Sequence, residues 1–354
     1  MRYLAAAAAA AALLVAGCTS SPGNPGQGAG SGSRGPGSGS GTPRVTVRLG
    51  YVADVTQAPA IVGIREGLFT ASLGRGTAIR PVLFATEGAE AAALAAGKLD
   101  AAYASPDTIL AVLAAHRASP IVVISGASAA GAELVISRRL GGPSALSGHT
   151  IAVPAAGGTQ DVTLRGWLAS RHLSTGTRPG VAVTAIAQGP AVVAAFRSGR
   201  IAGAFEPAPW DLELAAAGGR ILTGDAGPAA TTRTAAANLV VTRRFLDADS
   251  AAVYGLLRGQ VEANDFLRRD FLQSTLAIQA QLAAAGQPVS SSLLALAMAQ
   301  VTFTDDPLGT SLAGQARQAA AEGLAPPTPV PAGLYDIAPL DLVLRDAGEP
   351  PVTN

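Results

Sequence analysis

HTIAVPAAGGTQDVTLRGW, residues 149–167, joins a short apolar strand, a Gly-Gly turn and the start of an amphipathic helix. The proline after IAV ends the pairing of the strand, and the two glycines let the backbone approach a ligand closely. Thr159 or Asp161 is positioned to cap the helix, whose apolar residues recur at helical spacing. The unpaired N–H groups and positive dipole of such a helix start favour an anion or a polar head group, although ordinary α/β packing explains the same pattern.

The same order of elements occurs earlier in the chain. Residues 45–50 predict a strand that is followed by Thr56-Gln57 and an apolar helix, as residues 150–153 are followed by Thr159-Gln160. A Gly-basic pair then follows each Thr-Gln pair, Gly97-Lys98 after 41 residues and Gly199-Arg200 after 40. Preserved order with preserved spacing indicates an internal duplication.

Each copy is interpreted as strand, loop and helix, then strand and helix, then a buried strand. The last strand of each copy ends at a proline, Pro106 or Pro207, which we expect to begin a helix because proline suits the first helical turn. Strands that alternate with helices predict a parallel sheet with helices on both faces. Ligands of such open sheets bind beyond the carboxyl ends of the strands, so two facing lobes would form a cleft lined by helix starts that closes by a hinge movement.

The predicted fold class is therefore α/β, with two doubly wound lobes joined by a two-strand hinge. Lobe I is expected to hold residues 44–128 and 235–354, and lobe II residues 129–234. Four helices near residues 251–266, 272–284, 291–300 and 312–321 are expected to pack on lobe I as its helical C-terminal portion.

The first 18 residues are typical of an export signal. The apolar run that follows Met1-Arg2 is shorter than the roughly 20 residues needed to span a bilayer. The run ends in LVAGC, which resembles a bacterial lipobox and predicts lipidation of Cys18, the only cysteine. The alternative is a plain secretory signal that contains a cysteine by chance. Residues 19–43, rich in Ser, Gly and Pro, predict a disordered tether.

Composition excludes several classes of function. A net charge of +1 without a basic cluster gives no footprint for nucleic acid. A single cysteine permits no disulfide framework. The three histidines are scattered, so neither a metal set nor a cofactor is predicted, and no nucleophile is paired with a base.

Several short stretches together resemble the solute-binding proteins of ABC importers, in the nitrate, sulfonate and taurine group with the type II periplasmic-binding-protein fold. The matching stretches are Leu49-Gly50-Tyr51, Gln57-Ala58-Pro59, Glu66-Gly67-Leu68-Phe69, Ala96-Gly97-Lys98-Leu99-Asp100, Ile151-Ala152-Val153-Pro154, Gly158-Thr159-Gln160-Asp161, Glu206-Pro207, Val301-Thr302-Phe303-Thr304 and Leu334-Tyr335-Asp336. One departure is Ala202, which stands where the second copy should carry an acid like Asp100 in the first.

The resemblance implies a receptor that captures a small polar or anionic solute, such as a sulfonate, taurine, nitrate or an amine-bearing heterocycle. It implies delivery to an ABC importer permease with its ATPase, from a monomer held by the lipid on Cys18 at the outer face of the cytoplasmic membrane. Two other functions remain open from the sequence. One is an enzyme on the same bilobal fold, and the other is a ligand-binding sensor lipoprotein without transport.

The resemblance also implies a set of ligand contacts. They are Gln57, Ser105, Gly126, Ser128, Thr159, Gln160, Asp161 and Glu206. The two glutamines suit a ligand better than a cap, because each amide offers two donors and an acceptor. Ser105 either faces the ligand or caps its own helix, with the cap slightly favoured. Asp161 either faces the ligand or pairs with Arg165 one turn further on.

Glu206 bears on the class of ligand. A carboxylate in the cleft would oppose a bare oxyanion and favour a ligand with an ammonium or N–H group. Alternatively, Glu206 points into the hinge and pairs with an arginine. Trp210, shortly after it, is expected either in the packing of the lobe or in a wall of the cleft.

Overall fold

The computed structural model describes residues 45–116, 119–176, 179–187, 189–222, 234–323 and 327–352. The predicted signal, Cys18 and the tether lie outside these ranges. Residues 223–233, near the end of the predicted lobe II, also lie outside these ranges.

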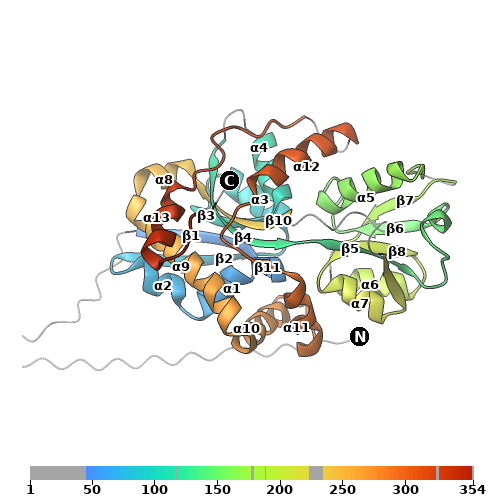
Figure 1. The fold of residues 1–354 in the computed structure, drawn as a ribbon, viewed down its shortest axis with the longest axis horizontal. Coiled ribbons are helices and arrows are strands. Elements are labelled where there is room, and N and C mark those ends of the chain that lie inside the picture. Colours follow the sequence, from blue (N-terminus) through green and yellow to red (C-terminus); the bar gives the residue numbers. More distant parts are fainter. Residues whose placement is uncertain are drawn as a thin grey trace, which may run out of the picture. The chain divides into compact units, whose positions relative to one another are not determined.

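Lobe I contains a six-stranded sheet in the order β11-β4-β10-β3-β1-β2 (Figure 1). Its strands are β1 (Val45–Val52), β2 (Thr77–Phe84), β3 (Ala101–Ala104), β4 (Ile121–Ala130), β10 (Thr234–Thr242) and β11 (Thr302–Phe303). β1 pairs in parallel with β2 and β3, whereas β10 is antiparallel to β3 and β4. The parallel part is the βαβ unit that the alternating pattern predicted.

Lobe II contains a five-stranded sheet in the order β7-β6-β8-β5-β9. Its strands are β5 (Ala132–Ser137), β6 (Thr150–Val153), β7 (Ala182–Ala185), β8 (Gly203–Pro207) and β9 (Gly219–Leu222). The chain enters this lobe where β4 continues into β5 after one intervening residue, close to the predicted boundary at residue 129.

Helices cover both faces of each sheet. They are α1 (Ala58–Arg65), α2 (Leu68–Leu73), α3 (Glu87–Ala95), α4 (Pro106–Ala114), α5 (Thr159–Ser170), α6 (Pro190–Arg197), α7 (Trp210–Ala216), α8 (Arg243–Ala248), α9 (Ser250–Arg269), α10 (Phe271–Ala284), α11 (Ser291–Gln300), α12 (Gly309–Ala321) and α13 (Ala338–Ala347), with 3-10 turns η1 (Val55–Gln57) and η2 (Pro143–Leu146). None of the described helices is long and apolar enough to cross a membrane.

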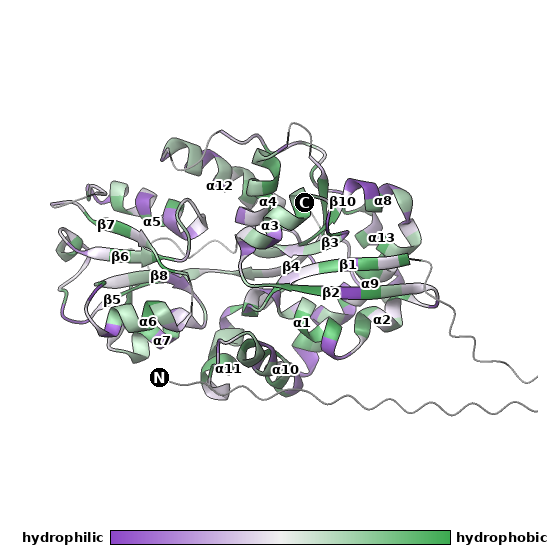
Figure 2. Ribbon diagram, turned by 180° about the vertical axis from the view of Figure 1, so that it is seen from behind, coloured by the Kyte–Doolittle hydropathy of each residue, from purple (hydrophilic) through white to green (hydrophobic). Residues whose placement is uncertain are grey.

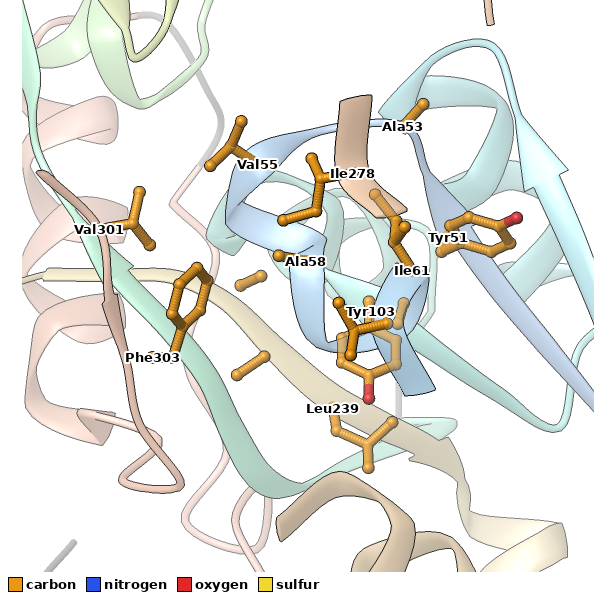
Figure 3. Close-up of a cluster of buried hydrophobic side chains, with 14 of the residues drawn as sticks. Tyr51, Ala53, Val55, Ala58, Ile61, Tyr103, Leu239, Ile278, Val301 and Phe303 are labelled. Atoms are coloured by element: carbon orange, nitrogen blue, oxygen red, sulfur yellow. The ribbon is translucent and has the colours of Figure 1, made fainter. Parts of the chain in front are cut away.

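The core of lobe I lies on both sides of its sheet. One cluster joins β1, β3 and β10 to α1, α9 and α10, and Figure 3 shows Ile61, Tyr103 and Leu239 within it. Tyr103 also makes an edge-to-face contact with Phe69. A second cluster packs α3 and α4 onto the other face. β3 and β4 are buried along almost their whole length, because helices cover both faces of the sheet (Figure 2).

The strand register bears out the internal duplication. β6 pairs in parallel with β7 and β8, as β1 does with β2 and β3. Leu49 stands opposite Ala101, and Ile151 stands opposite Gly203 at the same spacing. The two copies therefore place equivalent residues at equivalent positions of the two sheets.

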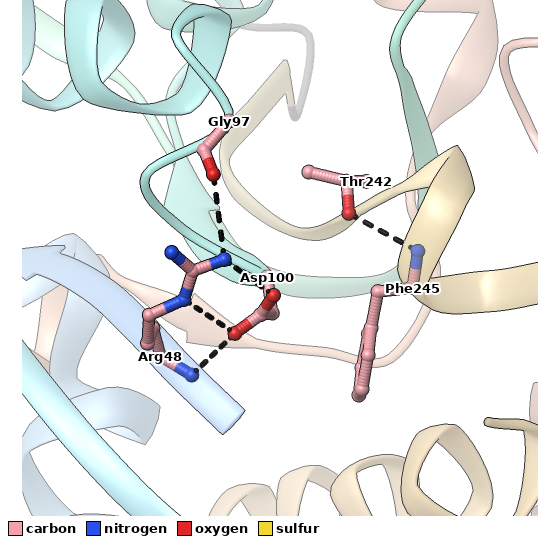
Figure 4. A network of polar contacts seen from close by, with 5 residues as sticks. All are labelled: Arg48, Gly97, Asp100, Thr242 and Phe245. Atoms are coloured by element: carbon pink, nitrogen blue, oxygen red, sulfur yellow. Dashed lines mark hydrogen bonds and ion pairs between the residues drawn. The ribbon is translucent and has the colours of Figure 1, made fainter. Parts of the chain in front are cut away.

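This equivalence explains Ala202. Asp100 N donates to Arg48 O at 3.0 Å, and Ala202 N donates to Thr150 O at 2.8 Å, so Thr150 takes the place of Arg48. In the first copy Arg48 Nε and Nη2 bind the two oxygens of Asp100 at 2.8 and 2.7 Å (Figure 4). Burial opposes the charge of Asp100, but these bonds from Arg48 hold the pKa of its carboxyl below the ordinary value. The second copy lacks both the cation and the acid, so no unpaired partner remains.

One of the two predicted helix starts needs correction. α4 begins at Pro106 as expected, but α7 begins at Trp210 rather than at Pro207, which is the last residue of β8. Ala208 precedes Pro209, and a residue before proline disfavours helical dihedral angles, so the helix starts later.

The C-terminal helices also differ in one respect from the expectation. α9 packs against α1 and α2 of lobe I as predicted. α12 packs against β10 of lobe I and also against α5 of lobe II. α12 therefore connects the two lobes.

Candidate functional site

α5 begins where the Gly-Gly turn predicted, yet its cap is different. Gly158 is the N-cap residue and provides no side chain, so the expectation that Thr159 or Asp161 caps the helix is wrong. Asp161 instead accepts from Gly157 N at 2.9 Å and pairs with Arg165 Nε at 2.6 Å. The pairing alternative for Asp161 is therefore the one that the structure contains.

A carboxylate from the other lobe occupies the start of α5. Thr159 N donates to Asp107 Oδ2 at 2.9 Å, and Thr159 Oγ1 donates to Asp107 Oδ1 at 2.7 Å. Asp107 is in the first turn of α4, in lobe I. An acidic side chain is favourable at a helix N-terminus, and here it satisfies an N–H group that the helix cannot pair itself. The two lobes thus meet through this pair.

Ser105 holds the start of α4. Its Oγ accepts from Thr108 N at 3.2 Å, which confirms the capping interpretation, and donates to Glu87 Oε2 at 2.9 Å. Glu87 is the first residue of α3. Neither Glu87 nor Asp107 was among the predicted contacts. The signal that could have found them is an acid in the first turn after each strand, where helix starts from neighbouring strands converge.

Asp54, Glu87 and Asp107 form what we call the carboxylate cluster of lobe I. They follow β1, β2 and β3 respectively. Burial, and then the charge of Asp107, raise the pKa of Glu87 to about 7; the hydrogen bond from Ser105 opposes the shift and Asp54 adds to it. Burial also raises the pKa of Asp107, against the hydrogen bonds from Thr159. No cation contributes to either pKa shift.

A second set of predicted contacts surrounds η1. Gln57 is fully buried, and its Oε1 accepts from Val52 N at 2.9 Å while its Nε2 has no partner among the described residues. Ser128 Oγ donates to Thr56 O at 2.5 Å, which fastens this turn to β4. Gln57 Nε2 is therefore a donor without a partner among the described residues, whereas the hydroxyl proton of Ser128 is donated to Thr56 O.

Gly126 has a structural role. Its N–H donates to Asp305 O at 2.7 Å, and a Cβ atom added to it would lie 2.2 Å from Asp306 O. The segment that follows β11 thus covers this residue, and only glycine permits the close approach. Gln160, the remaining predicted contact, is partly exposed on the first turn of α5.

Glu206 is fully buried in β8, and neither of its carboxylate oxygens has a partner among the described residues. It stands opposite Glu133 of β5, and burial together with the charge of Asp211 raises its pKa well above the ordinary value. No arginine of the described ranges forms an ion pair with it, so the alternative of a hinge arginine finds no support there. Trp210 is 4% exposed and belongs to the packing of the hydrophobic core.

α12 covers the start of α5 from the lobe I side. Gln315 Oε1 lies 3.4 Å from Thr159 Oγ1, and Gln318 Nε2 donates to Val162 O at 3.5 Å. A Cβ atom on Gly166 would lie 2.3 Å from Gln318 Nε2, so glycine on α5 allows this approach. In the part of the chain that the structure describes, no three His, Cys, Asp or Glu side chains gather as a metal site.

The family profile of the NMT1-like family matches residues 40–283, more than half of the chain. The chain belongs to the NMT1-like family. No curated protein sequence matches it.

Solved structures similar to this NMT1-like protein share its two-lobed fold. The alkanesulfonate-binding protein SsuA from Xanthomonas axonopodis pv. citri, bound to MOPS, is 19% identical, with a TM-score of 0.62 over 80% of this chain and 94% of that one. The aliphatic sulphonate-binding protein SsuA from Escherichia coli is 17% identical, with a TM-score of 0.65 over 82% of this chain and 95% of that one. The nitrate-binding protein NrtA from Synechocystis PCC 6803 is 13% identical, with a TM-score of 0.65 over 85% of this chain and 88% of that one. The predicted α/β class with two lobes is confirmed.

Proposed function

We propose that this protein is an extracytoplasmic solute-binding receptor, which holds a small polar solute between its lobes and delivers it to an ABC importer permease with its ATPase. The observation that carries the proposal is the meeting of α4 from lobe I and α5 from lobe II at the Asp107–Thr159 hydrogen bonds. Helix starts that face each other across two sheets bring several polar groups to one solute. The binding activities of the similar alkanesulfonate- and nitrate-binding proteins support the same reading.

The proposed contacts are those predicted from the sequence together with the two acids that the fold adds. They are Gln57, Ser105, Gly126, Ser128, Thr159, Gln160, Asp161 and Glu206, with Glu87 and Asp107. Among these, the unpartnered Nε2 of Gln57 and the unpartnered carboxylate of Glu206 are the groups with most bonding capacity to spare.

A thermal-shift screen tests the receptor. Small sulfonates, taurine, nitrate and amine-bearing heterocycles are added singly to residues 44–354, and a true solute raises the melting temperature because it binds only the folded state. Recovery of the bound solute unchanged from denatured protein supports a receptor. Turnover of that solute would instead assign an enzyme, and the absence of any stabilising solute would remove the proposal.

The membrane anchor is a separate part of the proposal. We propose that Cys18 carries a lipid and holds the receptor at the outer face of the cytoplasmic membrane as a monomer. Full-length protein labelled with a fatty-acid analogue is expected to partition into the detergent phase, and a Cys18→Ala variant is expected to remain unlabelled. Label retained by the variant would place the lipid elsewhere.

A further inference from the structure

Two acids of lobe I, Glu87 and Asp107, lie at the start of α4, where the two lobes meet. Ser105, which caps α4, donates a hydrogen bond to Glu87. Asp107, in the first turn of α4, accepts a hydrogen bond from Thr159 of lobe II. The ion pairs among the described side chains are Arg48–Asp100, Arg165–Asp161 and Arg268–Asp265, so neither Glu87 nor Asp107 takes part in one. Buried carboxylates without a cation are costly, which is why such groups are normally paired or protonated.

Asn238 supplies an independent sign that this place accepts a ligand. It is 2% exposed, and its Oδ1 has no partner among the described residues. On β10 it stands opposite Ala104, the residue before Ser105, just as Val240 stands opposite Ala102. Val240, Ala102 and Ala104 all belong to the cluster beneath α3 and α4, so Asn238 points into the layer that holds the two acids.

α12 adds further unmatched polar atoms above the same layer. Ser311 Oγ and Gln315 Nε2 are buried without partners in the described structure. The two residues are one helical turn apart, Leu312 beside them packs in the cluster with Val240, and Gln315 reaches Thr159. Acids on one side and unmatched amide and hydroxyl groups on the other therefore surround the junction of α4, α5 and α12.

We propose that the solute carries a positively charged nitrogen group, a protonated amine or an amidinium, which Glu87 and Asp107 hold at this junction beneath α12. This inference rests on the proposed receptor function and names the class of its solute. The ammonium donates to the two carboxylates and to Asn238 Oδ1, and a neighbouring hydroxyl or carbonyl of the solute accepts from Gln315 Nε2.

The contact at the start of α5 argues against a bare oxyanion at this place. Asp107 already occupies the N–H group of Thr159, so an anionic head group would have to displace it and then lie beside Glu87. Like charges at close range repel, whereas a nearby cation lowers the free energy of each ionised carboxylate in the cluster. The raised pKa values of Glu87 and Asp107 agree with acids that await a positive partner.

Matched probes test the charge of the solute. Taurine with isethionate, and acetamidine with acetamide, each compare a positively charged nitrogen group with an uncharged group of similar shape; methanesulfonate and nitrate represent bare anions. Calorimetry on wild-type residues 44–354 is expected to show that taurine or acetamidine binds at least tenfold more tightly than the matched probe that lacks this positive charge. Tighter binding of isethionate, methanesulfonate or nitrate overturns the inference and leaves the receptor standing. If no probe of any charge binds, both fail.

Two isosteric variants locate the charge. Glu87→Gln and Asp107→Asn are each expected to weaken the cationic probe at least tenfold, and Asp265→Asn, in the exposed pair with Arg268, is the control that leaves its affinity unchanged. Circular dichroism of each variant verifies the fold. Unchanged affinity in both folded variants contradicts the assignment. If a variant does not fold, the wild-type comparison of matched probes still decides.

Discussion

At the scale of single residues, the two copies of the duplicated unit differ by one ion pair. Arg48 and Asp100 bond through both carboxylate oxygens, and Arg48 N donates to Asp100 Oδ2 at 2.9 Å as well. Thr150 and Ala202 occupy the equivalent positions of the other sheet without any such bond. The fold thus accommodates both partners or neither, and a single remaining partner is expected to be unfavourable because it would lose its hydrogen bonds.

Removing only the acid is therefore expected to cost more than removing the pair. Asp100→Ala should lower the free energy of unfolding by about 1–2 kcal/mol, mainly because the backbone N–H of Arg48 loses its acceptor; the partly exposed guanidinium contributes less. The double variant Arg48→Thr with Asp100→Ala, which copies the second unit, should recover part of that loss in urea denaturation. A double variant as unstable as the sum of the single changes would show that the pair is not a unit.

At the scale of secondary-structure elements, the contact between α5 and α12 depends on a missing side chain. Gly166 on α5 leaves room for Gln318 of α12, whereas Gly314 on α12 has nothing within 4 Å of its added Cβ atom. Both glycines are in helices, where glycine is less favourable than alanine by roughly 0.5–1 kcal/mol. Replacing Gly314 by alanine therefore measures helix propensity alone, whereas replacing Gly166 also measures the packing against Gln318.

Gly314→Ala is expected to raise the free energy of unfolding by about 0.5–1 kcal/mol, since it changes only the helix. Gly166→Ala should gain less or become destabilising, because the methyl group displaces Gln318 and its bond to Val162 O. Chemical denaturation of the two variants side by side measures the difference. Equal stabilisation by both changes would mean that α12 yields to the methyl group without loss.

Local patterns predicted most elements because their signals are local. Apolar residues at helical spacing placed α9 to α12 within a few residues of their bounds, and the Ser105-Pro106 pair fixed the start of α4. The partners of these elements were not predictable in this way. The docking of α12 on α5, and the approach of Asp107 to Thr159, join residues far apart in sequence.

The candidate site follows the same division. Ser105 and Thr159 were found because each begins a helix after a strand, whereas Glu87 and Asp107 gain their importance from each other and from the opposite lobe. Gly126 lies close to the backbone of Asp306, which is distant in the chain, and only glycine permits this approach. A pattern of single residues holds no information on such neighbours.

At the scale of the whole molecule, three carboxyl groups have pKa values raised to about 7, namely those of Glu87, Asp211 and Asp305. Burial is the largest cause for each. Around Asp305, the bond from Asn264 and the charge of Arg268 oppose the shift, while Glu349 and Asp265 add to it. Around Asp211, hydrogen bonds from backbone N–H groups oppose it and Glu133 adds to it.

These shifts predict that stability falls as the pH rises. The unfolded chain releases these protons near pH 4, while the folded protein keeps them until about pH 7, so between those values the folded state binds more protons. The stabilisation is complete below the unfolded pKa and is lost as the pH passes the folded pKa. The melting temperature should therefore be higher at pH 5.5 than at pH 8. Scanning calorimetry at the same ionic strength for both pH values measures the difference.

Asp305→Asn provides the control, because an amide keeps the shape of the side chain and does not titrate. This variant should show a smaller difference in melting temperature between pH 5.5 and pH 8 than the wild-type protein. A wild-type melting temperature that rises over this interval would contradict the assignment of the three raised pKa values.

The position of α12 has a consequence for how relatives of this protein should be compared. If the lobes part to exchange a solute, the contacts at Gln315 and Gln318 must break, although both residues are 156 positions away from their partners on α5. The rate of exchange would then vary among relatives with substitutions in α12 even when every residue that touches the solute is the same. Residues 309–321 are thus a place to look for differences in transport speed between proteins of identical specificity.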